Sequence, residues 1–342
     1  MRIKKPIVIF LVVSLLLGGC STRVIDEQQV AKNEKIVIKF SHVVSENTPK
    51  GLAAKRFANL VRERTGGYVE VQVFPNSMLY KDGEEFEALK SGAVQMLAPA
   101  TSKLTAMFPE WQLFDLPYAF PDMKSAHTLM DGPLVQELFS HLKEQKFLGL
   151  AMWDSGFKQF TNNIRPLRKP EDFHGLHFRI MNSQVLKTQF AELGAQASPM
   201  SFNDVYQALE NGTVDAEENT ISNIYTQNFD NIQKYLTLSN HGYIGYVVLT
   251  NTDFWQSLPT PVRKILEDTL REVTIWERDI AGKMEQNQLT ELRQEGKMSI
   301  TTLSQGERLQ LQKALNPVYD HLSQEIGPDL VNKVKKIQEK GG

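Results

Sequence analysis

The stretch IVIKF at residues 36–40, followed by TPKGLAAKRFANLVRERTGG at 48–67 and VEVQV at 69–73, sets the pattern for the chain. In the first and third segments every second residue is apolar, as on a strand. Between them, apolar residues recur at helical spacing, with Thr48 placed to cap a helix and Pro49 to open it. These residues predict a strand, a helix and a second strand in succession.

The same alternation continues along the chain. Further strands are expected at 94–98, 147–153, 176–181 and 243–251, and helices at 84–91, 134–146, 185–194, 205–212 and 262–295. A helix over 262–295 would be about 50 Å long and could brace two lobes. We therefore expect an α/β protein with mostly parallel sheets, in which ligands bind beyond the strand ends or between lobes.

The length and composition favour a globular protein of two lobes. The chain has 342 residues, against about 100–200 for one domain. Its formal charge of −2 gives no basic field for a nucleic-acid partner. The expected division is lobe I at 35–156 with part of 245–284 returning to it, lobe II at 157–244 with part of 285–316 packing on it, and a C-terminal helical tail at 317–342.

The N-terminus is built like a bacterial export signal. A basic start precedes an apolar run at 7–17, and LGGC at 17–20 ends it. The run is shorter than the roughly 20 apolar residues of a transmembrane helix. LGGC looks like a lipobox, so we expect a signal peptide at 1–19 and a flexible tether over 20–34. Cys20 is expected to carry the lipid, with palmitate among its acyl groups. The protein would then be extracytoplasmic and anchored to the cell membrane. The alternative is an uncleaved anchor helix with an incidental cysteine.

Signatures of catalysis and of cofactor binding are missing. The sequence has no phosphate-binding glycine loop, dinucleotide fingerprint, nucleophile elbow or zincin motif. We therefore expect no enzyme, no cofactor and no metal. His174 and His177 flank Gly175 and are interpreted as loop histidines rather than metal ligands. For an enzyme, the candidate acid–base groups near the cleft would be His42, His241 and Asp154.

Cations beside strand ends and helix starts remain as the candidate site. Arg179 lies in an otherwise apolar strand segment, where an unpaired charge is costly. Its partner is either an internal acid, Glu217 or Glu218, or a ligand carboxylate, which the guanidinium fork can hold with two bonds. Lys50 at a helix start and Lys158 at a strand start are further cations that could face an anion.

Around Arg179 the chain resembles a known family. GLHFRI at 175–180, LGA at 193–195, PMSFNDVYQALENGTVD at 199–215 and Glu218-Asn219 resemble the DctP-type extracytoplasmic solute receptors of TRAP (tripartite ATP-independent periplasmic) transporters. Supporting segments are FSHVV at 40–44, TPKG at 48–51, FDLPY at 114–118, SNIYTQ at 222–227, HGYIGY at 241–246 and FW at 254–255. TPKG and HGYIGY look most like the branch that binds four-carbon dicarboxylates.

The resemblance implies a periplasmic-binding-protein-like fold, in which two α/β lobes bridged by strands and a long helix close on an organic acid like a flytrap. It implies that Arg179 clamps a ligand carboxylate and that Asn219 adds a hydrogen bond. Lys158 falls on the second cationic position, where many relatives carry arginine. Further expected ligand-binding residues are Lys50, Thr101 and Ser102 for the distal carboxylate, and Phe157, Tyr225 and Tyr243 for the walls.

The sequence therefore predicts a solute-binding lipoprotein that captures succinate, fumarate or malate. It would deliver the dicarboxylate to TRAP-type membrane subunits or to another secondary transporter. The alternative is a dicarboxylate co-receptor that presents its loaded form to a membrane sensor kinase.

Overall fold

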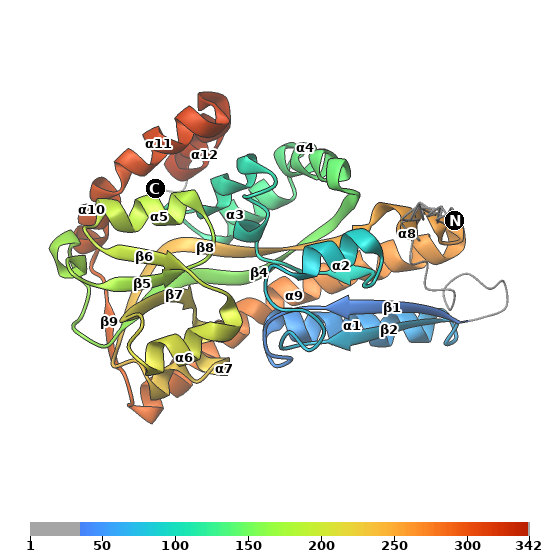
Figure 1. The fold of residues 1–342 in the computed structure, drawn as a ribbon, viewed down its shortest axis with the longest axis horizontal. Coiled ribbons are helices and arrows are strands. Elements are labelled where there is room, and N and C mark those ends of the chain that lie inside the picture. The colour runs from blue at the N-terminus through green and yellow to red at the C-terminus, as the bar shows by residue number, and fades with distance from the viewer. Residues whose placement is uncertain (1–34, 341–342) are drawn as a thin grey trace, which may run out of the picture.

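The structure, a computed structural model, describes residues 35–340 (Figure 1). The expected signal peptide, Cys20 and most of the tether lie outside the described residues. The strands are β1 Ile36–Ser41, β2 Val69–Phe74, β3 Met96–Leu97, β4 Phe147–Asn162, β5 His177–Ile180, β6 Gln196–Pro199, β7 Ala216–Thr220, β8 Tyr235–Asn251 and β9 Ser299–Thr302. They form one sheet in the order β2-β1-β3-β8-β4-β7-β5-β6, with β9 paired to β8.

Helices cover this sheet. They are α1 Pro49–Arg64, α2 Glu85–Ser91, α3 Met123–Met130, α4 Pro133–His141, α5 Gln184–Glu192, α6 Val205–Glu210, α7 Ile221–Thr226, α8 Thr252–Ser257, α9 Thr260–Glu295, α10 Gln305–Ala314, α11 Asn316–Ile326 and α12 Pro328–Lys340. Within residues 35–340, none of them combines the length and the apolar character that crossing a bilayer requires.

The first unit forms as its sequence predicts. β1 and β2 pair in parallel, and α1 connects them. The Thr48 side chain accepts a hydrogen bond from the Gly51 backbone nitrogen at 3.2 Å, which caps the first turn of α1, and Pro49 is its first residue.

β4 and β8 are much longer than their apolar segments predicted. They run antiparallel over 16 and 17 residues, and the expectation of mostly parallel sheets is wrong at the centre of the sheet. The second half of β4 carries buried polar side chains, among them Lys158, Gln159 and Thr161, which pair with partners inside the protein. An apolar-run criterion ends the strand too early because it scores such residues as loop.

The fold is two-lobed, and both long strands run through both lobes. We call β1–β3 with α1–α4 and α8 lobe I, and β5–β7 with α5–α7 and β9 lobe II (Figure 1). The division of the chain at 156/157 stays a prediction, since β4 crosses that position without a break. The ladder between β4 and β8 does shift register between Asp154 and Gly156.

The long helix α9 bridges the two lobes, as expected. Near its start, Thr269 accepts a hydrogen bond from Arg64 of α1 at 3.0 Å. Near its end, Leu292 is buried with Ile224 and Leu236 in an apolar cluster of lobe II. Its 36 residues therefore contact lobe I at one end and lobe II at the other.

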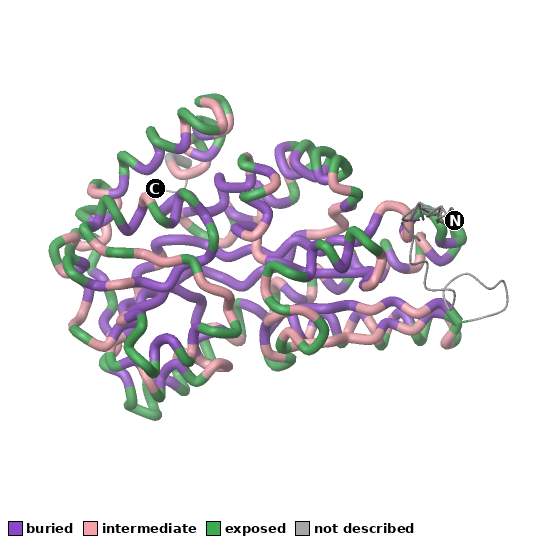
Figure 2. Tube along the Cα trace, viewed as in Figure 1, coloured by how far each residue is buried: buried purple, intermediate pink, exposed green. Residues whose placement is uncertain are grey.

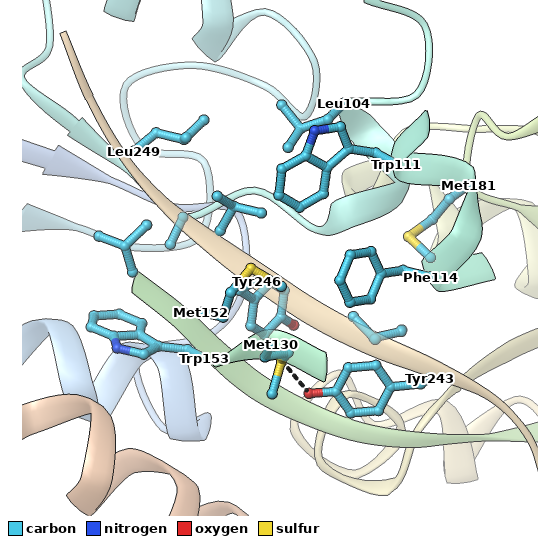
Figure 3. Close-up of a cluster of buried hydrophobic side chains, with 14 of the residues drawn as sticks. Leu104, Trp111, Phe114, Met130, Met152, Trp153, Met181, Tyr243, Tyr246 and Leu249 are labelled. Atoms are coloured by element: carbon cyan, nitrogen blue, oxygen red, sulfur yellow. Dashed lines mark hydrogen bonds between the residues drawn. The ribbon is translucent and has the colours of Figure 1, made fainter. Parts of the chain in front are cut away.

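Apolar burial follows the sheet from one lobe into the other. Figure 2 shows the central strands buried and the outer faces of the helices exposed. Where β4 and β8 cross between the lobes, aromatic side chains such as Trp111, Phe114 and Tyr243 gather around the two strands (Figure 3). Rings of this kind supply large buried area at the place where the lobes meet.

Two glycines give a matched test of packing. A Cβ on Gly149 of β4 would lie 2.5 Å from Cδ1 of Phe139, whereas a Cβ on Gly282 of α9 would meet nothing within 4 Å. We expect Gly149→Ala to lower the free energy of unfolding by about 1–3 kcal/mol through overpacking. Gly282→Ala should raise it by about 0.5–1 kcal/mol, because alanine loses less chain entropy in a helix. Urea unfolding of both variants measures this, and equal effects of the two substitutions would contradict the packing described.

Candidate functional site

Arg179 projects from β5 and is buried, and no acid among residues 35–340 forms an ion pair with it. Its Nε and Nη2 donate hydrogen bonds of 3.1 and 2.8 Å to the Met200 carbonyl, and its guanidinium carbon lies 5.8 Å from the centre of the Phe202 ring. Burial lowers the pKa of this guanidinium, and Asp82 opposes that shift. Across the described residues, no carboxylate forms an ion pair with Arg179. The internal salt bridge that the sequence left open as an alternative is therefore wrong.

The two glutamates of β7 have other partners. They point to opposite faces of the strand, as adjacent residues do. Glu217 accepts hydrogen bonds from Asn219 at 3.0 Å and Thr161 at 3.2 Å. Burial raises the pKa of Glu217 to about 7. Since its charge is weakened and its oxygens are occupied, it does not hold the Arg179 guanidinium.

Glu218 is the acid of a separate buried network. One oxygen lies 2.5 Å from Nζ of Lys158, and the other lies 2.8 Å from Nε2 of His241. Burial alone would raise the pKa of this carboxyl, but Lys158 and His241 outweigh it and hold the pKa at about 2. The positive charge of Lys158 is therefore paired with an internal acid, Glu218.

Arg179 lines a small cavity between the lobes. The cavity has a volume of about 30 Å³. Lobe I contributes Val43, Val44, Lys50, Asp82, Ala100 and Lys103, and Arg179, Met181, Phe202, Asn219 and Asn223 come from lobe II and its flanking segments, with Ile244 and Tyr246 from β8. A wider groove of about 490 Å³ shares Asp82 and Lys103 with the cavity and runs past Met200 and Ser201. The cavity thus lies where closure of the lobes would enclose a ligand.

The cavity is electropositive. Lys50 is fully buried, donates to the Ala98 carbonyl at 2.8 Å and lies 3.6 Å from the centre of the Tyr246 ring. Burial lowers the pKa of Lys50 to about 7. Lys103 forms an ion pair of 2.7 Å with Asp82. Of the described residues that line the cavity, three are cations and one is an acid, so the formal charge is +2 when Lys50 is protonated.

Of the residues predicted from the sequence, Arg179, Asn219 and Lys50 meet at this cavity. The others do not line it. Lys158 lies in the Glu218 network, and its Cε would be 2.3 Å from a Cβ on Gly242. Two further residues outside the lining are Thr101, whose buried hydroxyl has no partner among the described residues, and Ser102, which donates to Asp115 at 2.5 Å.

The three aromatic residues predicted for the walls also lie away from the cavity lining. Tyr243 donates to Asp154 at 2.5 Å, and Phe157 packs edge-on against its ring. Tyr225 is partly exposed and hydrogen-bonds Glu291 of α9.

Sequence reasoning missed several lining residues: Asp82, Lys103, Phe202, Asn223 and Tyr246. Lys103 follows directly on two predicted residues, Phe202 lies in the motif at 199–215, and Asp82 lies in no motif. Asn223 is part of SNIYTQ and Tyr246 part of HGYIGY. Their side-chain directions could not be read from those strings.

The candidate acid–base groups of an enzyme have separate partners. Asp154 hydrogen-bonds His127 at 2.7 Å as well as Tyr243, and His241 hydrogen-bonds Glu218. Burial lowers the pKa of His42 to about 3 and that of His241 to about 4, which keeps both rings neutral. In the part of the chain that the structure describes, no three His, Cys, Asp or Glu side chains converge as metal ligands.

The chain is similar to known solute-binding proteins. Residues 40–325 match the family described as DctP, bacterial extracellular solute-binding protein, family 7. The chain is 45% identical to the C4-dicarboxylate-binding protein DctB of Bacillus subtilis, covering 92% of this chain and 90% of that one. It is 44% identical to the C4-dicarboxylate-binding periplasmic protein DctP of Rhodobacter capsulatus, covering 88% and 91%.

The fold is also similar to solved structures of TRAP periplasmic solute-binding proteins. A TRAP periplasmic solute-binding protein from Sulfurospirillum deleyianum with bound succinate superposes with a TM-score of 0.85 at 42% identity, covering 88% of this chain and 98% of that one. One from Pseudomonas aeruginosa with bound L-malate superposes with a TM-score of 0.81 at 39% identity, covering 83% and 99%.

The Lys158–Glu218 pair can be tested by substitution. Lys158→Met leaves a buried carboxylate without its ammonium, so we expect the free energy of unfolding to fall by about 3–5 kcal/mol. Adding Glu218→Gln should recover most of this loss, because no buried charge is then unpaired. Urea unfolding followed by circular dichroism measures both variants. A single variant as stable as the parent would contradict an internal role for Lys158.

Proposed function

Because the chain belongs to the DctP family of bacterial extracellular solute-binding proteins, we propose that the cavity between its lobes captures a four-carbon dicarboxylate. The protein binds succinate, fumarate or malate outside the cytoplasm and delivers it to the membrane components of a TRAP transporter. The family is one of solute-binding transport proteins, which is not an enzyme class.

The observation that carries the proposal is the charge of the cavity. Lys50, Lys103 and Arg179 line the same space, and Asp82 is the one acid among the described residues that line it. A dianion of a short diacid would neutralise the remaining charge. Arg179 suits one carboxylate because its planar fork can form two parallel bonds. Lys50 and Lys103 come from lobe I and suit the other carboxylate.

Ligand binding in this arrangement requires the lobes to move. A cavity of about 30 Å³ has room for water but not for a diacid, so the ligand enters an opened form. Closure then places lobe I cations and lobe II groups on one ligand. Charge-assisted hydrogen bonds from both lobes to the ligand stabilise the closed form over the open form. This difference in ligand affinity between the two forms is what drives a conformational change. Exclusion of water strengthens each ionic contact.

The co-receptor alternative is not favoured, since the relatives are described as dicarboxylate-binding proteins and as TRAP solute-binding proteins.

We further propose that Cys20 carries a lipid anchor, with LGGC at 17–20 as the supporting observation. Labelled palmitate should be incorporated into the full chain in a bacterial host but not into Cys20→Ser. Equal labelling of the two would refute the anchor.

Calorimetric titration of the signal-free chain with succinate, fumarate and malate tests the ligand class. We expect at least one of these diacids to bind. Arg179→Met should weaken its binding by at least about 100-fold, because a buried charge-assisted pair is lost. Arg168→Met is the matched control, since Arg168 is half exposed and pairs with Glu307, and it should leave the affinity unchanged. Absence of binding to every diacid, or a normal affinity after Arg179→Met, would overturn the proposal.

The affinity should depend on pH. Burial places the pKa values of Lys50 and Glu217 at about 7 and that of Glu85 at about 8. As pH rises from 6.5 to 8, Lys50 loses a positive charge and the two glutamates gain negative charge. All three changes disfavour a dianion, so affinity should fall by about tenfold. Titrations across this range measure the slope, which should be flatter in Lys50→Met. An affinity that rises with pH would contradict this electrostatic account.

A further inference from the structure

One residue that lines the cavity carries a buried polar atom that a plain diacid cannot pair. Asn223 lies on α7, lines the cavity beside Arg179 and Lys50, and is only 4% exposed. Its Oδ1 is buried and has no hydrogen-bond partner among the described residues. A buried acceptor left unpaired is costly, so an atom of this kind calls for a donor.

The orientation of the Asn223 amide follows from its neighbours. The Thr220 backbone nitrogen donates to Oδ1 of Asn219 at 3.1 Å, and Nδ2 of Asn219 donates to Glu217 at 3.0 Å. Both contacts fix which end of the Asn219 amide is the oxygen. Nδ2 of Asn223 then donates to that same oxygen at 2.8 Å. The unpaired atom at the other end of Asn223 is therefore an acceptor.

Two donors of the cavity lining, the Tyr246 hydroxyl and the Lys50 ammonium, have other acceptors. The Tyr246 hydroxyl donates to Ser155 at 3.2 Å and is itself 3.5 Å from Nδ2 of Asn223. Lys50 donates to the Ala98 carbonyl. Neither of them donates to Oδ1 of Asn223, so a group that enters the cavity can supply this donor.

We propose that Asn223 is a specificity-determining residue that accepts a hydrogen bond from a hydroxyl on the ligand, so that the cavity prefers a 2-hydroxy four-carbon diacid such as malate over succinate. The inference rests on the proposed function. A dicarboxylate anion offers only acceptors, whereas a 2-hydroxyl group adds one donor next to a carboxylate. Succinate leaves Oδ1 of Asn223 unpaired in a closed cavity, and malate satisfies it.

Discrimination should be large enough to measure. A site that hydrogen-bonds a substrate hydroxyl rejects the analogue without it, because the buried group is then left unpaired. The preference should also depend on the configuration at the carbon that bears the hydroxyl. The cations that hold the two carboxylates fix the direction of the ligand, and Asn223 approaches it from one side. One enantiomer of malate should bind about tenfold or more tightly than succinate, and the other no more tightly than succinate.

Calorimetric titration with succinate, L-malate and D-malate tests the inference on the signal-free parent chain, without any variant that must fold. Asn223→Leu then removes the acceptor at similar volume. It should lose the preference for one malate enantiomer over the other and over succinate. Asn211→Leu, at an exposed asparagine outside the cavity, is the matched control and should keep the preference. The melting temperature of each variant checks that it is folded.

The outcomes separate the two proposals. Binding of succinate as tightly as both malates by the parent chain overturns the role of Asn223 and leaves the dicarboxylate function standing. A malate preference that persists in folded Asn223→Leu also overturns the role of Asn223 and leaves the dicarboxylate function standing. Absence of binding to all three ligands overturns the proposed function itself.

Discussion

The site depends on a buried guanidinium, that of Arg179, which within residues 35–340 donates to one backbone carbonyl and to no carboxylate. Arg179 sits between two lobes, and the acids that could neutralise it are committed to other groups. Glu217 accepts from Asn219 and Thr161, and Glu218 is paired with Lys158 and His241. An unpaired buried charge is costly, and a ligand carboxylate removes that cost. The same internal pairs that stabilise lobe II therefore leave Arg179 available to an anion.

Access of an anion to Arg179 depends on how the elements that run through both lobes bend. β4, β8 and α9 each contact both lobes, so relative motion of the lobes must be absorbed where they cross. The register of β4 shifts between Asp154 and Gly156, and Gly156 has a φ of 117°, a conformation that favours glycine. Asp154 is held there by Tyr243, by His127 and through its backbone nitrogen by Glu277 of α9 at 2.9 Å. A local kink tied to three elements is a suitable place for a hinge.

Local signals predicted much of the fold. Thr48 and Pro49 mark the start of α1 as the structure has it, and the proline-free run after Val262 became the long helix α9. The second half of β4 could not be predicted, because its buried polar residues find partners far away in sequence. The site divides in the same way. Arg179, Asn219 and Lys50 meet as the motifs predicted, whereas Lys158 is taken by Glu218, 60 residues away. Only the tertiary structure reveals which of these two buried cations has no acidic partner among the described residues.

The proposed function requires that Arg179 holds a ligand carboxylate in the cavity between the lobes. A crystal structure of the signal-free chain grown with succinate tests it most directly. We expect one carboxylate within hydrogen-bond distance of the Arg179 guanidinium and the other facing Lys50 or Lys103, with both lobes in contact with the ligand. Succinate bound elsewhere, with Arg179 still donating only to the Met200 carbonyl, would contradict it.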